Sequence, residues 1–239
     1  MVERNISPSR ERAKKSIMAG LVLVNDVPVD KAGALVDRQA RISLKGNDMP
    51  YVSRGGLKLE TSLKEAGIDL HGLTALDIGA STGGFTDCLL QHGISRVYAV
   101  DVGYGQLDWR LRQDERVVVI ERTNIRHMPY ERINDTVDLV AIDTSFISLK
   151  IVIPAAEKFM KDGTAVFALI KPQFEAGRDK VEKGGVVRDE AILQAVIEDV
   201  ASFCENRGFT VQSVRPSPVL GPKGNREYII SLKYMKEND

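Results

Sequence analysis

The sequence has few of the features that mark a secreted, metal-binding or membrane-spanning protein. It holds two cysteines, Cys88 and Cys204, and neither has the CxxC or Cys/His spacing of a metal site. No apolar run reaches the roughly 18–20 residues that a membrane span needs, and the first residues lack the apolar core of a signal peptide. We therefore expect a cytoplasmic protein with no membrane partner and no metal ion, in which both cysteines are buried as small apolar residues.

Net charge is also absent, because 33 Lys and Arg residues balance 33 Asp and Glu residues. The basic and acidic residues are unevenly spread along the chain. Residues 1–60 contain 11 basic and 7 acidic side chains, so the rest of the chain carries the compensating negative charge. A basic end on a neutral chain indicates a polyanionic partner, although a charge-rich helix is more often only a solvated surface.

Residues 1–45 have the pattern of a small α+β domain. The run 7–11, with a serine cap, an early proline and an acidic residue in the first turn, predicts the start of a helix that ends near Gly20. An apolar run predicts a strand at 21–24, which a tight turn at Asn25-Asp26 joins to 27–29 as a hairpin. The runs 35–36 and 41–44 are further short apolar segments. Polar residues with Gly and Pro come next and predict a linker at 46–52, which leaves 53–239 as the second domain.

From Thr74 onward, strand and helix patterns alternate. Apolar runs predict strands at 75–78, 96–100, 117–120, 137–142, 164–170, 209–214 and 227–232. Helical patterns lie between them at 85–92, 151–160 and 189–207. Near-continuous apolar strands separated by helices predict an α/β fold with a mostly parallel sheet covered on both faces. We expect the last strand to run antiparallel.

The loop after the first of these strands has the composition of a cofactor site. It runs from Asp77 to Phe85, and its glycines allow a tight turn and the close approach of a ligand. The next strand ends in Asp101, whose carboxylate can accept hydrogen bonds from both hydroxyls of a ribose. A dinucleotide enzyme more often shows GxGxxG, whereas Asp77 disfavours a pyrophosphate and suits a cationic ligand. S-adenosylmethionine carries a sulfonium and an ammonium group and is the favoured ligand; the alternative is a tight turn with no ligand.

Four charged residues fall where strands or helices of this layout begin or end: Lys58, Asp143, Lys171 and Glu227. An antiparallel last strand starts at the edge where the parallel strands end, so all four can converge on one crevice. A ribose 2′-hydroxyl needs a base to remove its proton, and burial or a nearby cation lowers the pKa of a lysine enough for that task. Lys171 is then the predicted base and Lys58 the nearby cation, with the two carboxylates holding the ammonium groups. The alternative is a set of surface charges or structural salt bridges.

These residues resemble the Lys-Asp-Lys-Glu tetrad of FtsJ-like 2′-O-methyltransferases. The wider chain resembles the TlyA family, often labelled hemolysin A, whose members are rRNA ribose methyltransferases. The runs that carry the resemblance are 51–59, 76–87, 97–107, 121–124, 143–149, 169–175 and 221–228. They cover nearly the whole chain, and so many long runs make the match specific.

The resemblance implies a Rossmann-like methyltransferase domain that binds S-adenosylmethionine, with catalysis by the tetrad. The residues expected to hold the cofactor are Asp77, Gly79, Ala80, Ser81, Thr82, Gly83, Gly84, Phe85, Asp101 and Asn124. The segment from Ser9 to Asn25 resembles an S-four RNA-binding domain, whose basic helix contacts phosphates. The predicted RNA contacts are Arg10, Arg12, Lys14, Lys15 and Arg54. The implied partner is ribosomal RNA or a ribosomal subunit, and no stable protein partner is expected.

Two departures from the family patterns stand out. The S-four domain normally begins with a helix carrying an Arg-Leu-Asp pattern, and this sequence starts after most of that helix. The glycine loop reads Ser81-Thr82 where the FtsJ type has Ala-Pro, and Phe85 replaces Trp. The second departure matches the TlyA branch and warns against assuming the FtsJ substrate.

Three other functions are weighed against this one. A membrane-lytic protein is disfavoured because the sequence has no signal peptide, no membrane span and no strongly amphipathic surface helix. A non-catalytic ribosome-assembly factor is disfavoured by the intact tetrad. Base methylation commonly uses an Asn/Asp-Pro-Pro-Tyr/Phe motif or a catalytic cysteine, whereas the fourth predicted strand ends in Asp143-Thr144-Ser145-Phe146. The sequence does not identify the nucleotide.

Overall fold

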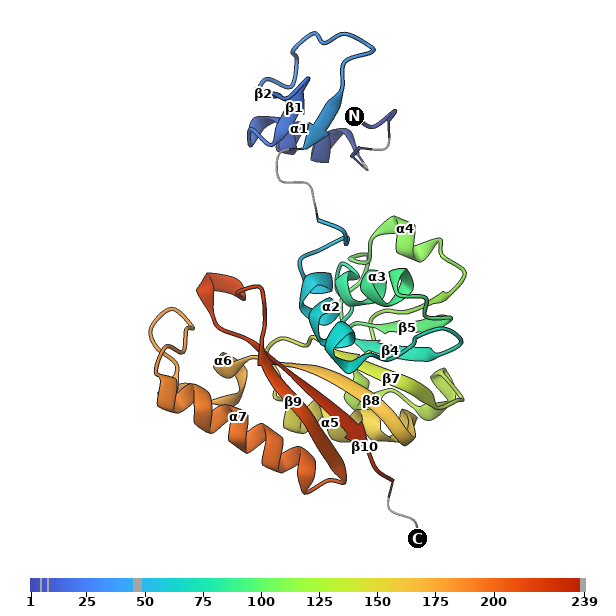
Figure 1. Cartoon of the computed structure of the whole chain (residues 1–239), viewed down its shortest axis with the longest axis vertical. Helices are drawn as coiled ribbons and strands as arrows, with labels where there is room; N and C mark the ends of the chain where they lie inside the picture. Colours follow the sequence, from blue (N-terminus) through green and yellow to red (C-terminus); the bar gives the residue numbers. More distant parts are fainter. Residues whose placement is uncertain (5, 8, 45–48, 237–239) are drawn as a thin grey trace. The chain divides into compact units, whose positions relative to one another are not determined.

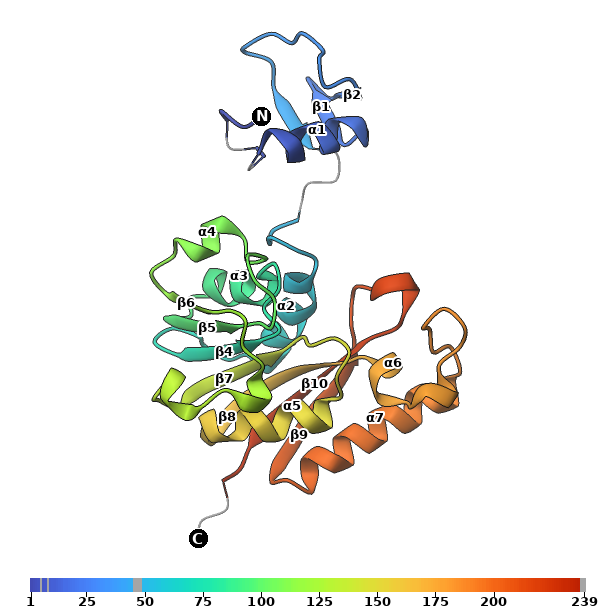
Figure 2. The same ribbon diagram turned by 180° about the vertical axis from the view of Figure 1, so that it is seen from behind.

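The computed structural model of the protein describes residues 1–4, 6–7, 9–44 and 49–236 (Figures 1 and 2). The chain forms two compact units, residues 1–50 and 51–239, and each is described by itself. The predicted linker at 46–52 falls partly outside the described residues. The predicted domain boundaries stay predictions.

The first unit is one helix and a three-stranded antiparallel sheet. Helix α1 (Arg10–Met18) begins where predicted, since the Ser9 hydroxyl accepts a hydrogen bond from the Arg12 backbone N–H. The strands β1 (Val22–Val24), β2 (Val27–Val29) and β3 (Ile42–Leu44) are ordered β2-β1-β3. Asn25 and Asp26 join β1 to β2, both with positive φ, which is the backbone that a two-residue hairpin requires. The predicted helix and hairpin are confirmed.

The second unit is built on a seven-stranded sheet. In spatial order its strands are β6 (Val117–Ile120), β5 (Arg96–Val100), β4 (Thr74–Ile78), β7 (Val137–Ile142), β8 (Met160–Ile170), β10 (Tyr228–Tyr234) and β9 (Phe209–Pro216). The first five run parallel to one another, and β10 runs antiparallel to both of its neighbours. This confirms a mostly parallel sheet with an antiparallel last strand.

Helices cover both faces of the sheet, as the apolar strands predict. The longer helices are α2 (Gly55–Ala66) and α3 (Gly84–Gln91) on one face and α5 (Leu149–Ala156) and α7 (Glu190–Glu205) on the other (Figures 1 and 2). Alternation along β4 shows the division, because Leu76 and Ile78 lie in the core with α5 and α7, whereas Ala75 lies in the core with α2 and α3. Asp77 belongs to the second face, although its side chain is charged.

Short helical segments complete the unit. They are α4 (Trp109–Arg112), α6 (Pro172–Glu175) and the 3₁₀ turns η1 (Ile125–His127), η2 (Tyr130–Arg132), η3 (Glu157–Phe159), η4 (Arg178–Lys180) and η5 (Pro222–Gly224). Each lies in a connection between longer elements.

Two parts of this unit differ from what the sequence predicts. The helix predicted at 151–160 ends at Ala156, because Met160 pairs with Val137 and already belongs to β8. The sequence pattern predicts no element at α2, since this helix opens with Gly55-Gly56 and glycine is a poor helix former. Gly56 is needed there for space: a Cβ at this position would lie 2.3 Å from the ring of Tyr51.

The core against α5 and α7 depends on large side chains that are fully buried. Phe159 has no exposed surface and packs in this core, so we expect Phe159→Ala to lower the free energy of unfolding by about 3–5 kcal/mol. Denaturant unfolding followed by circular dichroism measures this. Ile151→Ala, at a position that is 47% exposed, is the matched control and should cost far less. Equal losses in the two variants would contradict the core assignment.

Candidate active site

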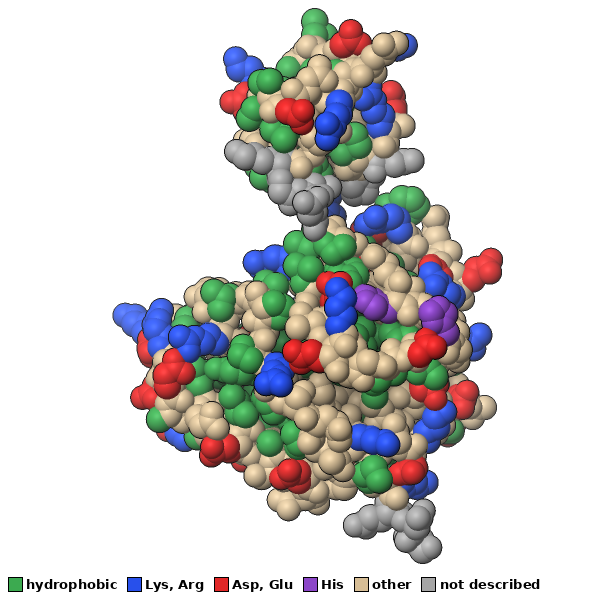
Figure 3. All heavy atoms as spheres, in the orientation of Figure 1, with side chains coloured by type: hydrophobic (Ala, Val, Ile, Leu, Met, Phe, Trp, Pro, Cys, Tyr) green, Lys and Arg blue, Asp and Glu red, His purple; other side chains and the backbone are tan. Residues whose placement is uncertain are grey.

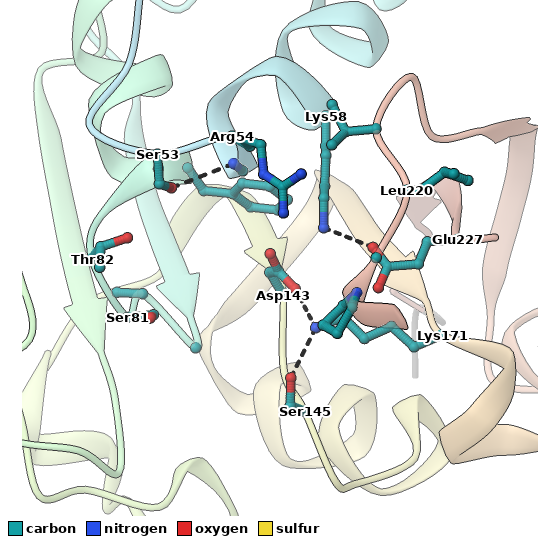
Figure 4. A pocket seen from close by; sticks show the side chains of 18 residues that line it. Ser53, Arg54, Lys58, Ser81, Thr82, Asp143, Ser145, Lys171, Leu220 and Glu227 are labelled. Carbon is teal, nitrogen blue, oxygen red and sulfur yellow. Dashed lines mark hydrogen bonds and ion pairs between the residues drawn. The ribbon is translucent and has the colours of Figure 1, made fainter. Parts of the chain in front are cut away.

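A cavity of about 290 Å³ lies at the carboxyl ends of the parallel strands (Figure 4). Its walls come from the start of α2, the glycine loop after β4, the loop after β7, the end of β8 and the segment before β10. All four members of the predicted tetrad line it: Lys58, Asp143, Lys171 and Glu227. The fold therefore brings together residues that the sequence separates by up to 169 positions.

The tetrad forms two ion pairs. Lys58 Nζ lies 2.7 Å from Glu227 Oε2, and Lys171 Nζ lies 2.5 Å from Asp143 Oδ1. These side chains are largely buried; that of Glu227 has no exposed surface and that of Lys171 is 9% exposed. The attraction between opposite charges is stronger in a buried site than in water, but taking the charges out of water costs desolvation free energy. Only close pairing offsets that cost, so the two pairs are expected to hold a single geometry.

The register of the antiparallel strand explains how Glu227 reaches this site. Tyr228 on β10 pairs with Ile170 on β8, so the residues just beyond this pair, Glu227 and Lys171, meet at the edge of the sheet. Gly221 lies against the same carboxylate, because a Cβ there would be 2.1 Å from Glu227 Oε1. A side chain at position 221 would displace Glu227 from the cavity.

The glycine loop lines the opposite wall. Six of its predicted cofactor residues border the cavity: Gly79, Ala80, Ser81, Thr82, Gly84 and Phe85. Gly79 has a φ of +85°, and a Cβ there would lie 2.7 Å from the Asp143 carbonyl oxygen. Only glycine combines this backbone with so close an approach. The loop after β4 and the loop after β7 are therefore packed directly against each other.

The other four predicted cofactor residues do not line this cavity. Gly83 (φ +96°) packs against leucine side chains of the following segment, and Asp77 is buried beneath the loop. Asp101 accepts hydrogen bonds from the backbone N–H groups of Ser81 (2.8 Å) and Gly103 (2.6 Å), so it is tied to the glycine loop. Asn124 caps η1 by accepting a hydrogen bond from the Arg126 N–H at 3.1 Å.

Asp77 has an unusual environment. The Thr86 hydroxyl donates to its Oδ2 at 2.6 Å, but its Oδ1 has no hydrogen-bond partner in the described part of the chain. Burial, assisted by the charge of Asp143, raises the pKa of Asp77 to about 7, against the lowering effect of the Thr86 hydrogen bond. A buried carboxylate oxygen without a partner fits a ligand that brings positive charge. This carboxylate oxygen and the glycine loop that borders the cavity together fit S-adenosylmethionine.

Several cavity residues were not predicted as catalytic or cofactor residues. Ser145 accepts a hydrogen bond from Lys171 Nζ at 3.0 Å. Ser53 and Arg54 border the cavity beside Lys58 (Figure 4), and of these Arg54 was predicted as an RNA contact. Val219 and Leu220 lie on the loop before β10. The sequence signal for Ser145 was its place two residues after Asp143, within a run that resembles the family.

Phe146 is an exposed aromatic residue that directly follows Ser145, which lines the cavity. Its side chain is 90% exposed, and its φ of +65° is uncommon for a residue with a side chain. The ring packs against Phe174, with the two ring centres 5.0 Å apart. An exposed aromatic face next to Ser145 is the type of surface on which a nucleic acid base stacks.

The remaining sequence predictions lie elsewhere. Arg10, Arg12, Lys14 and Lys15 are exposed on α1 of the first unit. Among the described residues, no group of three His, Cys, Asp or Glu side chains could hold a metal ion. Cys88 and Cys204 are buried within α3 and α7, and burial raises the pKa of each thiol to about 12. Neither cysteine borders the cavity.

Comparison with known proteins gives two family matches. The profile of the FtsJ-like methyltransferase family matches residues 51–234, and that of the S4 domain matches residues 1–42. These matches agree with the resemblances drawn from the sequence. They assign the sheet of the second unit to a methyltransferase and the first unit to an RNA-binding type of domain.

Relatives extend along most of the chain. The 16S/23S rRNA (cytidine-2′-O)-methyltransferase TlyA of Mycobacterium tuberculosis is 43% identical over 98% of this chain and 87% of that protein. Hemolysin A of Brachyspira hyodysenteriae is 43% identical over 92% of each chain. A solved structure described as a hemolysin, from Streptococcus thermophilus, has a TM-score of 0.79 and 44% identity, covering 96% of this chain and 84% of that one.

The buried Asp77 predicts a pH-dependent stability. Because its folded-state pKa is about 7 and its unfolded value is about 3.9, only the folded state keeps the proton between these limits. The free energy of unfolding should therefore fall as pH rises from about 4 to about 7, by at most about 4 kcal/mol. Denaturation without cofactor, followed by fluorescence of the single tryptophan, Trp109, measures this decline. Asp77→Asn should flatten it, and the exposed Asp135→Asn should not; parallel curves for all three proteins would contradict the assignment.

Proposed function

The chain belongs to the FtsJ-like methyltransferase family and is an S-adenosylmethionine-dependent methyltransferase, and we propose that it methylates a ribose 2′-hydroxyl of ribosomal RNA. The observation that carries this proposal is the pair of buried ion pairs in one cavity with the glycine loop. Hydroxyl methylation needs a base at the acceptor oxygen, and the proposal is supported by the two lysines, Lys58 and Lys171, that line the cavity.

The chemistry divides between the cofactor and the chain. When bound, S-adenosylmethionine supplies a methyl group made electrophilic by the sulfonium. Asp77 and the glycine loop would hold the cofactor, and Asp101 would bind its ribose hydroxyls. Lys171, as a neutral amine, would take the proton of the 2′-hydroxyl at Nζ, while Lys58 stays positively charged and stabilises the developing negative charge on the oxygen. Asp143 and Glu227 hold these two nitrogens in place, so positioning is the main contribution of the protein.

Ribosomal RNA as substrate is supported by the relatives and by the surface of the site. TlyA of Mycobacterium tuberculosis is named as a 16S/23S rRNA cytidine-2′-O-methyltransferase, and the S4 domain match accounts for the basic helix α1. The exposed ring of Phe146 offers a stacking surface for a base beside the reacting ribose. Methylation of a base is less well supported, because the strand end Asp143-Thr144-Ser145-Phe146 has no prolines and both cysteines are buried away from the cavity.

Two relatives are named hemolysins. Within the described residues, the structure contains no helix long and apolar enough to cross a membrane. A membrane-lytic activity therefore gains no support from an observed feature of this chain, whereas the methyltransferase family match extends over residues 51–234.

RNA affinity is assigned mainly to α1. Its four basic side chains, Arg10, Arg12, Lys14 and Lys15, are exposed within nine residues of helix, so they can neutralise several phosphates. The face of the second unit seen in Figure 3 has basic and acidic side chains interspersed. Arg54, which borders the cavity, would add a contact close to the reacting nucleotide.

Lys171→Ala tests the catalytic proposal. Transfer of a tritiated methyl group to purified, unmodified ribosomal subunits should fall by about 100-fold or more, because the variant has no base at the 2′-hydroxyl. Nucleoside analysis of the wild-type product should show a 2′-O-methylated nucleoside. The matched control is Lys161→Ala, since Lys161 lies on β8, the strand that leads to Lys171, and pairs with Asp138 outside the cavity. Wild-type protein that binds cofactor but transfers no methyl group would favour the non-catalytic assembly factor.

Substitution of the four basic residues of α1 by alanine tests the role of this helix in RNA binding. The dependence of RNA affinity on salt should weaken, with the slope of log K against log salt reduced by about 0.7–0.9 for each phosphate that the variant no longer neutralises. Fluorescence anisotropy with an rRNA fragment at several salt concentrations measures the slope. A control with the charges exchanged, Arg10→Lys, Arg12→Lys, Lys14→Arg and Lys15→Arg, should keep it. An unchanged slope in the alanine variant would mean that other residues bind the phosphates.

A further inference from the structure

Lys171 Nζ has two polar neighbours that differ in kind. One is Asp143 Oδ1, an ion-pair partner at 2.5 Å that makes no hydrogen bond within the described residues, and the other is the Ser145 hydroxyl, which accepts a hydrogen bond at 3.0 Å. We propose that Ser145 is a positioning residue, whose hydroxyl fixes the orientation of the Lys171 amine so that its lone pair points at the substrate hydroxyl. This inference rests on the proposed function, and it concerns a residue outside the tetrad.

The argument comes from the bonding capacity of an amine. A neutral lysine amine has two N–H groups and one lone pair, and rotation about the Cε–Nζ bond can turn the lone pair in several directions. Ser145 accepts one N–H, and this hydrogen bond restricts the lone pair to the two remaining tetrahedral positions. The carboxylate of Asp143, an ion-pair partner at 2.5 Å, attracts the second N–H and disfavours the lone pair on its own side. Lys171, Asp143 and Ser145 all border the cavity. Without Ser145, one N–H would lose its acceptor and the amine would rotate more freely.

Lys58 provides a contrast within the same cavity. Among the described residues, its Nζ has one hydrogen-bond partner, Glu227 at 2.7 Å. An ammonium group has three N–H donors, so Lys58 keeps donors available for an oxygen that is becoming negative. The two lysines are therefore equipped for different tasks: Lys171 to accept a proton in a fixed direction and Lys58 to donate hydrogen bonds.

The backbone around Ser145 holds its hydroxyl toward Lys171. The next residue, Phe146, adopts a φ of +65°, and its ring is anchored on Phe174 of α6. Farther along the same loop, the Ser148 hydroxyl and the Leu149 backbone N–H donate to the partly buried carboxylate of Glu175 at 2.5 and 2.8 Å. Since α6 directly follows Lys171, these contacts tie the loop that carries Ser145 to the strand end that carries the base.

In the proposed step, the O–H bond of the ribose hydroxyl breaks and an N–H bond forms at Lys171. The oxygen gains the methyl group, and the cofactor sulfur keeps the electron pair of the broken S–C bond and becomes a neutral thioether. The step needs no other reactant. Ser145 exchanges no proton with the substrate and affects the rate only through its hydrogen bond to the Lys171 amine.

Single-turnover methyl transfer by Ser145→Ala, with RNA and cofactor saturating, gives the first test. We expect the rate constant at the pH plateau to fall by about 10- to 100-fold, with cofactor affinity unchanged by calorimetry. The rising limb of the pH–rate profile should move to lower pH, because loss of the hydroxyl removes a hydrogen bond that favours the ammonium form. Ser145→Thr, which keeps the hydroxyl, should restore most of the rate. Ser202→Ala, at an exposed serine of α7, is the control.

A second measurement does not depend on turnover. Proteins labelled with ¹³C at lysine Cε report the titration of Lys171 by NMR, with the signal assigned from Lys171→Arg. The titration midpoint should be lower in Ser145→Ala than in wild type and unchanged in Ser202→Ala. An unmoved midpoint together with an unchanged plateau rate would overturn the role of Ser145 while leaving the proposed function intact. If the wild-type protein forms no 2′-O-methylated nucleoside, the proposed function and this inference both fail.

Discussion

Two ion pairs at the edge of one sheet are the constraint on which the rest of the site depends. Buried charges are tolerated only when they are paired and hydrogen-bonded, so Lys58 and Glu227 must meet although 169 residues separate them. The elements that position these two residues must all allow this contact. They are the start of α2, the length of β8 and the register of β10 against β8. A shift of the β10 register would leave a buried carboxylate without its cation and a buried lysine without its anion.

The antiparallel direction of β10 follows from the same requirement. Parallel strands deliver their carboxyl ends to one edge, where Asp143 and Lys171 lie after β7 and β8. A residue that precedes a strand reaches this edge only if its strand runs the other way, and Glu227 precedes β10. The reversed strand therefore adds a fourth charged group without another crossover helix. The close contact between Gly221 and Glu227 leaves room for the carboxylate under the loop before β10.

Most of the fold could be predicted from the sequence, and the reasons for success and failure are physical. Strands buried on both faces are continuous apolar runs, so β5, β6 and β7 were predicted with the bounds that the structure shows. Helix α2 was missed because Gly55-Gly56 opens it, and the need for Gly56 is visible only when the ring of Tyr51 is in place. The convergence of the tetrad was predicted from strand direction. The hydrogen bond from Lys171 to Ser145 could not be predicted, since it depends on how the loop after β7 lies against the end of β8, which no sequence pattern reports.

The buried polar atoms that lack a hydrogen-bond partner, and so lower the stability of the fold, lie close to the candidate site. In the described part of the chain, the buried side-chain atoms without a hydrogen-bond partner are Asp77 Oδ1, Asp143 Oδ1, Thr144 Oγ1, Gln173 Oε1 and Glu227 Oε1. All five belong to residues within three positions of the strand ends that carry the glycine loop and the tetrad. Unsatisfied polar atoms lower stability wherever they occur, and a fold usually keeps them only at functional sites. A cationic cofactor that supplied Asp77 with a partner would recover part of that stability on binding, so the unpartnered carboxylate oxygen would favour the proposed ligand.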